Sequence, residues 1–157
     1  MKKIGYIIIG ILLFAGIGYY LYKNTSNDTM QKTIKVYFDD LSVSVVGDTK
    51  YTKPTISNTV LKNYFINFNK INDSVSFEFN VVNDGNVSMK LSDIVYDFSY
   101  DKSLVEYELF YLDGNSVKIG DVLAPNSSKR VILKYNNLSD GEIELRNLGL
   151  FLIYKEI

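Results

Sequence analysis

The chain has 157 residues, with 17 basic and 18 acidic side chains and neither histidine nor cysteine. The commonest general base, thiol nucleophiles, disulfides and most transition-metal ligands are therefore excluded. All 18 acidic residues but only 14 of the basic ones follow Lys23, which gives this part a net charge near −4. That balance argues against nucleic acid as a partner, because nucleic-acid binding needs clustered lysine and arginine.

The first element is an uncharged run, Ile4–Tyr22, between Lys2-Lys3 and Lys23. As a helix it would be about 28 Å long, close to the hydrocarbon thickness of a bilayer. Residues 4–22 are therefore predicted to cross the lipid bilayer once, and residues 1–23 to form a membrane anchor. Because positive flanks stay inside, the N-terminus should be cytoplasmic and the C-terminal domain extracytoplasmic at the cell membrane.

We expect this signal-anchor to be retained. The apolar run is long and is followed by Tyr19–Lys23, which suits signal peptidase poorly. A cleaved signal peptide with its site near Ala15–Gly18 is an alternative. A prepilin leader at Lys2–Gly5 is another, although Gly10 stands where type IV pilins usually carry glutamate.

Residues 24–32 are polar and predict a tether, which leaves residues 33–157 for one extracytoplasmic domain. Apolar and polar residues alternate repeatedly in this domain, which predicts half-buried strands. The clearest strand is Val75–Val81, and alanine is too scarce to favour helices. Further strands are predicted at Ile34–Phe38, Leu41–Val45, Val87–Leu91, Val105–Tyr111, Val117–Ile119, Val131–Tyr135, Ile143–Leu145 and Leu148–Tyr154.

Turn-forming residues separate these strands. Asp39-Asp40, Asn83–Asn86, Asp113–Asn115 and Ala124–Asn126 are predicted as turns, and Asn83–Asn86 offers residues that tolerate positive φ. Thr55–Asn63 is the one weak helix candidate, inside the poorly patterned stretch between Val46 and Tyr64. An all-β antiparallel sandwich of seven to nine strands, preceded by one transmembrane helix, is the expected architecture.

Three segments, Val75–Ile94, Leu104–Tyr135 and Leu148–Ile157, carry a family resemblance. A strand ends in Asn83-Asp84-Gly85, a later turn reads Gly120–Pro125, and the closing strand runs through Tyr154. This order resembles N-terminally anchored Ig-like surface proteins of Gram-positive bacteria, near the TasA and camelysin-like families. The resemblance implies an Ig-like sandwich and, from the TasA relatives, assembly into matrix fibres. A camelysin-like metalloprotease is excluded, because no histidine exists for an H-E-x-x-H motif.

The residues that remain for catalysis are poorly arranged. Ser127 or Ser128 with Lys129 could form a dyad only across opposite faces of a strand. Glu106 and Glu108 share one strand face about 7 Å apart, but that face looks solvent-exposed. We therefore predict a protein that is not an enzyme, with no catalytic residues and no cofactor.

Calcium and sugar sites stay open. Oxygen ligands for calcium occur at Asp39-Asp40, at Asp84 with Asn83 and Asn86, and at Asp93-Asp97-Asp101, but none matches the EF-hand loop, so metal binding is left undecided. Phe77, Phe79 and Tyr107 have strand spacing and are predicted mostly in the core. Aromatic side chains that could form an exposed glycan platform are Tyr51, Tyr96, Tyr100, Phe110 and Tyr111.

The predicted function is a structural or protein-interaction component of the bacterial cell surface. The apolar run Leu148–Ile157 is expected at a sheet edge, where it could pair with a protein partner or with a second copy. A secreted TasA-like fibre or matrix subunit and a module that binds wall glycan or calcium are the alternatives.

Overall fold

The computed structural model describes residues 31–98 and 100–157. The predicted anchor, residues 1–23, and nearly all of the predicted tether lie outside these residues. Within the described part of the chain, no helix is both long and apolar enough to cross a bilayer. Lys32–Ile157 forms one compact unit.

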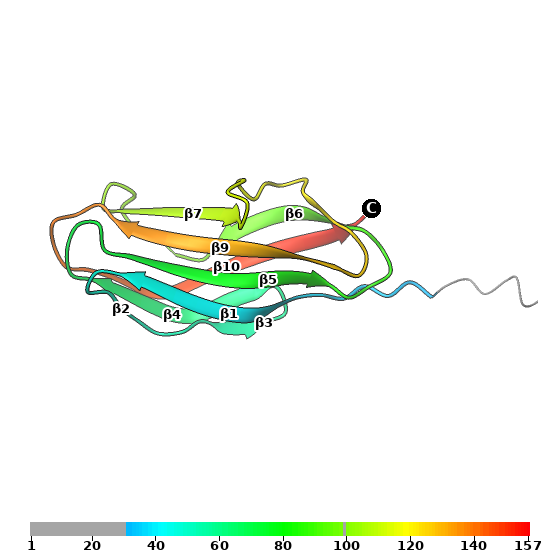
Figure 1. The fold of residues 1–157 in the computed structure, drawn as a ribbon, viewed down its shortest axis with the longest axis horizontal. Helices are drawn as coiled ribbons and strands as arrows, with labels where there is room; N and C mark the ends of the chain where they lie inside the picture. The colour runs from blue at the N-terminus through cyan, green and yellow to red at the C-terminus, as the bar shows by residue number, and fades with distance from the viewer. Residues whose placement is uncertain (1–30, 99) are drawn as a thin grey trace, which may run out of the picture. The chain divides into compact units, whose positions relative to one another are not determined.

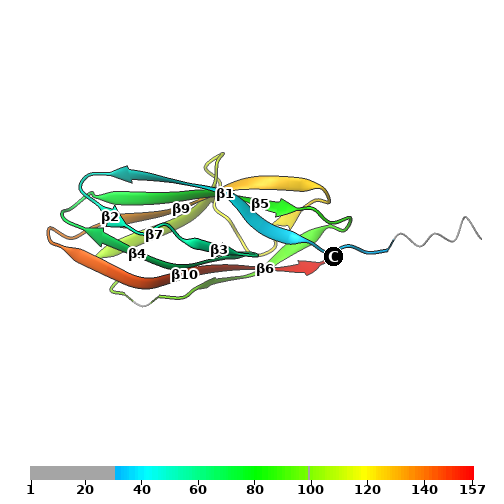
Figure 2. The same ribbon diagram turned by 90° about the horizontal axis from the view of Figure 1, so that it is seen from below.

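Two antiparallel sheets stack face to face and enclose the core, as the edge-on view in Figure 2 shows. The first sheet has four strands in the order β1-β5-β9-β7, and the second has six in the order β2-β4-β10-β6-β8, with β3 paired to β4. The predicted β-sandwich is thus confirmed. In the described residues the strands are β1 (Val36–Val46), β2 (Lys50–Tyr51), β3 (Thr55–Ser57), β4 (Val60–Phe68), β5 (Ser74–Asn83), β6 (Met89–Tyr96), β7 (Val105–Tyr111), β8 (Val122–Leu123), β9 (Ser127–Asn137) and β10 (Ile143–Glu156).

Consecutive strands from β4 to β10 always lie in opposite sheets, so each connection crosses the sandwich. Immunoglobulin domains instead keep several consecutive strands, such as the last two, as neighbours in one sheet. The strand order seen here is that of a jelly roll, in which two Greek keys are wound together. The difference matters for the site, because the β6–β7 connection spans one open side of the sandwich.

The core forms where the inward faces of both sheets meet. β5 shows the reason most simply, since Val75, Phe77, Phe79 and Val81 are all buried while the residues between them are partly solvated. Alternation with period two places these four side chains on one face of the strand. The prediction for this strand is confirmed, as is the core position of Phe77 and Phe79.

Two pairs of predicted strands are single strands interrupted by bulges. β1 runs through Asp39-Asp40, where the register with β5 shifts and Asp40 takes a positive φ of 51°. β10 runs through Asn147, with φ of 54°, where its register with β4 shifts. The turn predicted at Asp39-Asp40 is therefore wrong, because the extra residue is absorbed as a β-bulge that keeps the strand in its sheet.

Two further predictions are corrected. The helix candidate Thr55–Asn63 is a hairpin of β3 and β4, with Asn58 at φ 51° in its turn. The run Leu148–Ile157 does not lie at a sheet edge, because β10 pairs with β4 on one side and β6 on the other. Its first residues, up to Phe151, pair with β4, and those from Leu150 to Glu156 pair with β6, so β10 lies between two strands of the larger sheet.

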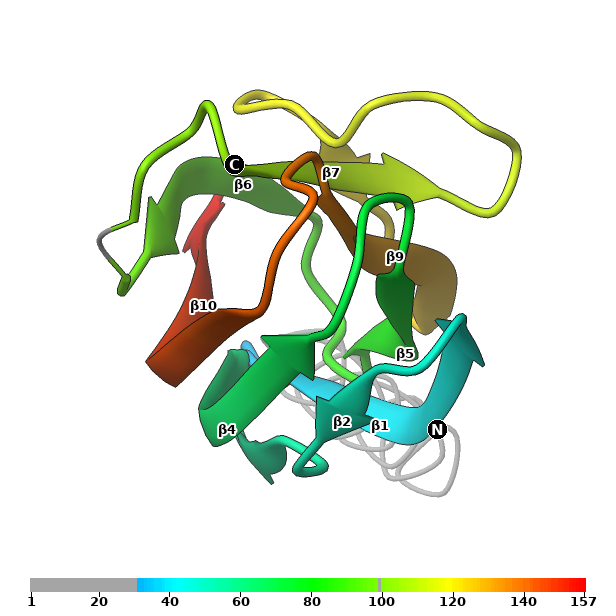
Figure 3. The same cartoon turned by 90° about the vertical axis from the view of Figure 1, so that its left-hand side faces the viewer.

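The sandwich has two ends with different contents. At one end, called the base, β1 begins and the C-terminus lies nearby (Figure 1). The Ile157 amide donates to the Ser88 carbonyl there, at 3.3 Å. At the other end, called the tip, the β1–β2, β4–β5 and β9–β10 connections turn, as the end-on view in Figure 3 shows.

Candidate interaction surfaces and pockets

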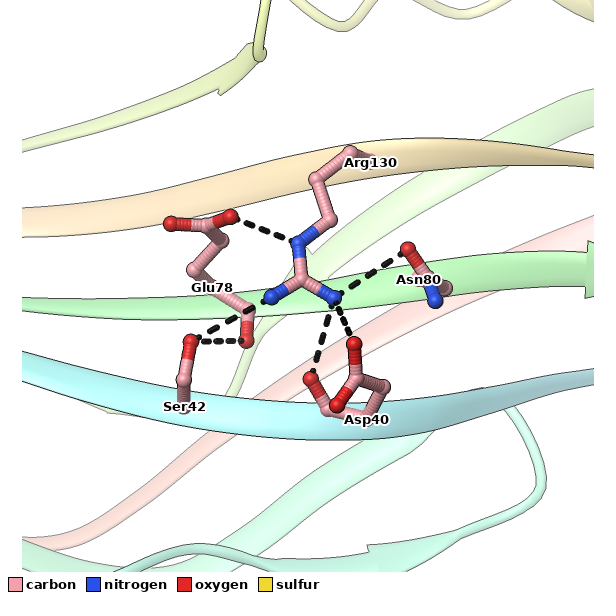
Figure 4. A network of polar contacts seen from close by, with 5 residues as sticks. All are labelled: Asp40, Ser42, Glu78, Asn80 and Arg130. Atoms are coloured by element: carbon pink, nitrogen blue, oxygen red, sulfur yellow. Dashed lines mark hydrogen bonds and ion pairs between the residues drawn. The ribbon is translucent and has the colours of Figure 1, made fainter.

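Arg130 ties three strands of the smaller sheet together on its outer face (Figure 4). From β9, its Nε donates to Glu78 on β5 at 2.6 Å, and one terminal nitrogen donates to the Asp40 carboxylate on β1 at 2.6 Å. The same nitrogen reaches Asn80 at 3.2 Å, and the other reaches Ser42 at 3.3 Å. The bulge in β1 brings Asp40 into this network.

All three guanidinium nitrogens of Arg130 donate hydrogen bonds to groups within the sheet. The hydrogen bond to Glu78 and the carboxylate of Asp40 raise the pKa of Arg130 above its ordinary value. Its side chain is 21% exposed, so few donors remain for a ligand. The arrangement clamps β1, β5 and β9 rather than offering an anion site.

The base is closed by the segment that leads into β1. The Thr33 amide donates to the Asn86 side chain at 2.8 Å, and the Asp84 amide donates to the Lys35 carbonyl at 2.9 Å. Lys32 and Lys35 form ion pairs with Glu156 and Asp84, respectively. The first residues of the domain are therefore fastened to the β5–β6 connection and to the end of β10.

Gly85 is required for this closure. A Cβ atom there would lie 2.3 Å from the Thr33 carbonyl oxygen and 3.1 Å from the Lys35 nitrogen. None of the residues from Asn83 to Asn86 has a positive φ. The turn was therefore predicted at the right place, but the expected reason, a backbone with positive φ, was wrong. Glycine is needed because two backbone segments touch, not because the backbone is left-handed.

Five tyrosines gather inside the sandwich near the tip and are called the tyrosine cluster: Tyr64, Tyr96, Tyr100, Tyr107 and Tyr135. The buried hydroxyls of Tyr64 and Tyr135 share a hydrogen bond of 2.9 Å that links the two sheets. Burial raises the pKa of Tyr96 to about 12 and raises those of Tyr64, Tyr100 and Tyr135 further. These hydroxyls are therefore neutral hydrogen-bonding groups at physiological pH.

A pocket of about 440 Å³ opens beside the tyrosine cluster. It is lined by Ile94, Val95, Tyr96, Phe98, Tyr100, Lys102 and Tyr107. Of the predicted aromatic platform, Tyr96 and Tyr100 belong to this pocket and are half-buried, Phe110 and Tyr111 are half-buried elsewhere, and Tyr51 is 39% exposed. The sequence reasoning missed Phe98 and Lys102, although the alternation Tyr96-x-Phe98-x-Tyr100 was a usable signal.

The tip carries exposed apolar side chains. Val46, Ile71, Leu104 and Leu138 are 37% to 62% exposed, and they are called the apolar tip. Hydrogen bonds join the loops of the last three, since the Leu138 amide donates to the Leu104 carbonyl at 2.8 Å and the Asn72 amide donates to the Asn137 carbonyl at 3.0 Å. Val46, at the end of β1, pairs with Ser74 at the start of β5. Exposed apolar residues that cluster on loops are typical of contact surfaces.

The residues weighed for catalysis are occupied or exposed. Ser127 Oγ donates to the Ala124 carbonyl at 2.6 Å, and Lys129 Nζ lies over the ring of Tyr111, 4.9 Å from its centroid. The structure thus gives Lys129 a ring contact and Ser127 a backbone partner. Glu106 and Glu108 are both exposed on β7.

Several carboxylates of the three candidate calcium sets have partners within the protein. Within the described residues, no three acidic side chains are grouped in a way that could hold a metal ion. Asp40 pairs with Arg130, Asp84 with Lys35, and Asp101 accepts from Ser103 at 2.7 Å through its side-chain hydroxyl. Asn83 is buried and donates to backbone carbonyls, among them that of Val87 at 2.8 Å.

No protein-family model, curated protein or solved structure matches this chain. The resemblance to the TasA and camelysin-like families therefore stays a prediction from the sequence.

Proposed function

We propose that this chain is a membrane-anchored, extracytoplasmic β-sandwich that acts as a protein-interaction component of the bacterial cell surface. One observation supports this function most directly: the domain is fastened at its base, next to its N-terminal segment, and presents the apolar tip at its other end. A domain held by the anchor at its base would direct the tip away from the bilayer.

The chemistry of the tip supports a protein as the partner. Val46 ends β1, and Ile71, Leu104 and Leu138 come from three different connections, so the surface is wider than any single loop. Covering apolar atoms contributes roughly 25 cal/mol per Å² to binding before the costs of association are subtracted. Jelly-roll loops on a rigid sandwich are well placed to display such a surface.

The first experiment is mass spectrometry of the mature protein from its native host. We expect a peptide that contains Met1–Lys23 in the membrane fraction. A mature N-terminus downstream of Lys23, with the domain in the medium, would instead favour the released matrix subunit.

The second experiment is photo-crosslinking on intact cells with a crosslinker at the tip. Leu138→Lys should abolish the crosslinked product, because it adds a solvated charge to the contact surface. Ile119→Lys is the matched control, since Ile119 is also exposed, at 63%, but lies outside the apolar tip. Equal crosslinking by both variants would contradict the role of the tip.

A further inference from the structure

β4 and β10 run side by side in the larger sheet (Figure 2), and each carries a bulge at the same place. Between the pairings of Ile66 and Tyr64, β10 holds one residue more than β4, and between those of Tyr64 and Leu61, β4 holds one residue more than β10. The two shifts cancel, because Leu61 pairs with Leu150 in the same register as Ile66 with Leu145.

Neither bulge is needed to fit the two strands together, since removing both would leave the pairs on either side in register. Each bulge holds an asparagine in the left-handed region, Asn63 at φ 59° and Asn147 at φ 54°. Residues other than glycine held there cost free energy, and such strain collects at functional sites. Bulges are also common beside such sites, where they re-aim side chains. The opposed bulges therefore call for a function on the sheet surface rather than in the ladder.

A pocket of about 440 Å³ lies at the two bulges, and it is called the bulge pocket. Its outward-facing lining residues are Thr52, Asn63, Phe65, Glu144, Arg146 and Asn147. The pocket is on the outer face of the larger sheet, because Ile66 and Leu145, which follow Phe65 and Glu144 in their strands, are buried in the core. Its lining shares no residue with the apolar tip.

The polar groups of the bulge pocket are available to a ligand. The side chains of Asn63 and Asn147 are exposed and make no hydrogen bond to other described residues. Thr52 Oγ1 accepts from the Phe65 amide at 3.0 Å, which leaves its hydroxyl proton able to donate. Arg146 pairs with Glu144 through one terminal nitrogen at 2.7 Å, and its other donors face solvent because the side chain is 73% exposed.

The charges of the pocket cancel, because Arg146 is paired with Glu144 and the other lining side chains are neutral. An anion would find no unpaired positive charge there. Two amides and a guanidinium–carboxylate pair offer donors beside acceptors, which matches hydroxyl groups, since each hydroxyl both donates and accepts. The half-buried ring of Phe65 adds a flat apolar surface, and the C–H face of a sugar ring is a matching partner for it.

We propose that the bulge pocket binds a neutral oligosaccharide. The face of one pyranose ring lies on Phe65, the amides of Asn63 and Asn147 bind its hydroxyl or acetamido groups, and the Arg146–Glu144 pair binds two neighbouring hydroxyls. The volume of the pocket lies in the usual range for small-ligand sites. This activity goes beyond protein docking at the apolar tip and does not depend on it.

The test is calorimetric titration of the full chain with cellohexaose and with chitohexaose, in a detergent that has no sugar headgroup. Asn63→Gly and Asn147→Gly are the central variants, because glycine adopts a positive φ readily and removes only the side-chain amide. If the asparagines served the backbone alone, glycine would replace them without loss of binding. Each variant should melt within a few degrees of the wild type and bind about five- to tenfold more weakly, the size of one lost hydrogen bond.

Arg146→Met should weaken binding about tenfold and change stability little, because the ion pair is exposed. Asn58→Gly is the matched control for the asparagines, since Asn58 also has a positive φ, 51°, but lies in the β3–β4 turn outside the pocket. Lys118→Met, which changes an exposed cation outside the pocket, is the control for Arg146. Both controls should bind as the wild type does.

Three outcomes would overturn the proposal. The first is no binding of either sugar at about 10 mM, a concentration that detects even very weak sites. The second is equal binding by the wild type, Asn63→Gly, Asn147→Gly and Arg146→Met. The third is binding of oligogalacturonate or of a serine-rich decapeptide, but of neither neutral sugar, which would assign the pocket to an anion or to a peptide. Crosslinking at the apolar tip should be unchanged in all of these variants, so the two functions are tested separately.

Discussion

At both the base and the tip of the sandwich, a buried asparagine side chain stabilises the turn that follows a strand of the smaller sheet. At the base, the buried side chain of Asn83 accepts from the Gly85 amide at 3.1 Å as β5 ends. At the tip, the buried side chain of Asn137 accepts from the Ser139 amide at 3.0 Å as β9 ends. Each asparagine bonds to the amide two residues later, which is the geometry of an Asx-turn.

What surrounds the two asparagines is different. The Asn83 amide group reaches carbonyls of the β5–β6 connection and, at 3.0 Å, Ala124 across the sandwich, under the segment that leads into β1. The Asn137 amide group reaches Lys70 at 2.9 Å and Gly141 at 3.3 Å, and apolar side chains beside it face solvent. The base is thus covered by the segment that leads into β1, whereas the tip leaves apolar side chains exposed for contact.

The largest expected effect concerns the tyrosine cluster near the tip. The pKa values of Tyr64, Tyr96, Tyr100 and Tyr135 are raised above 10 in the folded chain, so the folded state holds these protons more tightly than the unfolded state. Stability is therefore full below pH 10 and falls as pH rises toward 12 and beyond. The fully buried Tyr64 and Tyr135 should each contribute a slope of about 1.4 kcal/mol per pH unit, and the half-buried Tyr96 and Tyr100 should contribute less, because solvent screens them.

Urea unfolding at a series of alkaline pH values measures this slope. Tyr64→Phe should reduce it by the share of one tyrosine, because one buried phenol no longer ionises on unfolding. A free energy of unfolding that stays constant from pH 10 to 12 would contradict the burial of these hydroxyls.

The next effect compares the two asparagines directly. Asn83→Ala should destabilise the domain by about 3 kcal/mol, because several buried backbone groups lose their partners, and Asn137→Ala by about 2 kcal/mol. Chemical denaturation of both variants gives the difference. A larger loss for Asn137 would show that the tip, and not the base, is the better-fastened end.

Gly85→Ala tests the closure of the base and should cost about 1–2 kcal/mol, because the new methyl group displaces the segment from Thr33 to Lys35. Hydrogen exchange at the Asp84 amide, which donates to Lys35, should accelerate. Gly141→Ala is the matched control at the tip, where the nearest atom to a Cβ is Ser139 Oγ at 3.8 Å. Equal losses in the two variants would argue against the close contact at Gly85.

The smallest effect belongs to the ion pair between Lys32 and Glu156. Both side chains are well exposed, and exposed pairs contribute little, so Lys32→Gln should change stability by less than about 0.5 kcal/mol. Thermal unfolding at low and high salt checks this value. A larger, salt-dependent loss would mean that charge, rather than backbone pairing, fastens the base.

The sequence predicted the parts of the fold in which one face of a strand is buried and the other solvated. Val75–Val81 alternates cleanly for that reason. Leu148–Ile157 was expected at a sheet edge because a strand inside a sheet, with buried residues on consecutive positions, gives no alternation to separate it from an apolar edge. β2 and β3 are too short for any periodic signal, so the stretch from Val46 to Tyr64 could not be assigned.

The site was less predictable than the fold. Bulges at Asp40 and Asn147 depend on register with a partner strand, which a single chain segment does not encode locally. The pocket beside the tyrosine cluster is assembled from β6, β7 and the connection between them, so Lys102 comes to line it only through the topology. Arg130 was missed although it interrupts an apolar alternation, because its partners Asp40 and Glu78 lie 90 and 52 positions away.

The long pairing of β1 with β5 also has a mechanical consequence. β1 begins at the base and is paired with β5 from Val36 to Val46, nearly the whole length of the sandwich. A pull between the N-terminal segment and a partner held at the tip runs along these strands, so it loads the hydrogen bonds of the ladder together in shear. Arg130 also joins β1 to β5 and β9 through Asp40 and Glu78. The domain should therefore resist extension far better than a domain whose first strand can separate from its neighbour one hydrogen-bonded pair at a time.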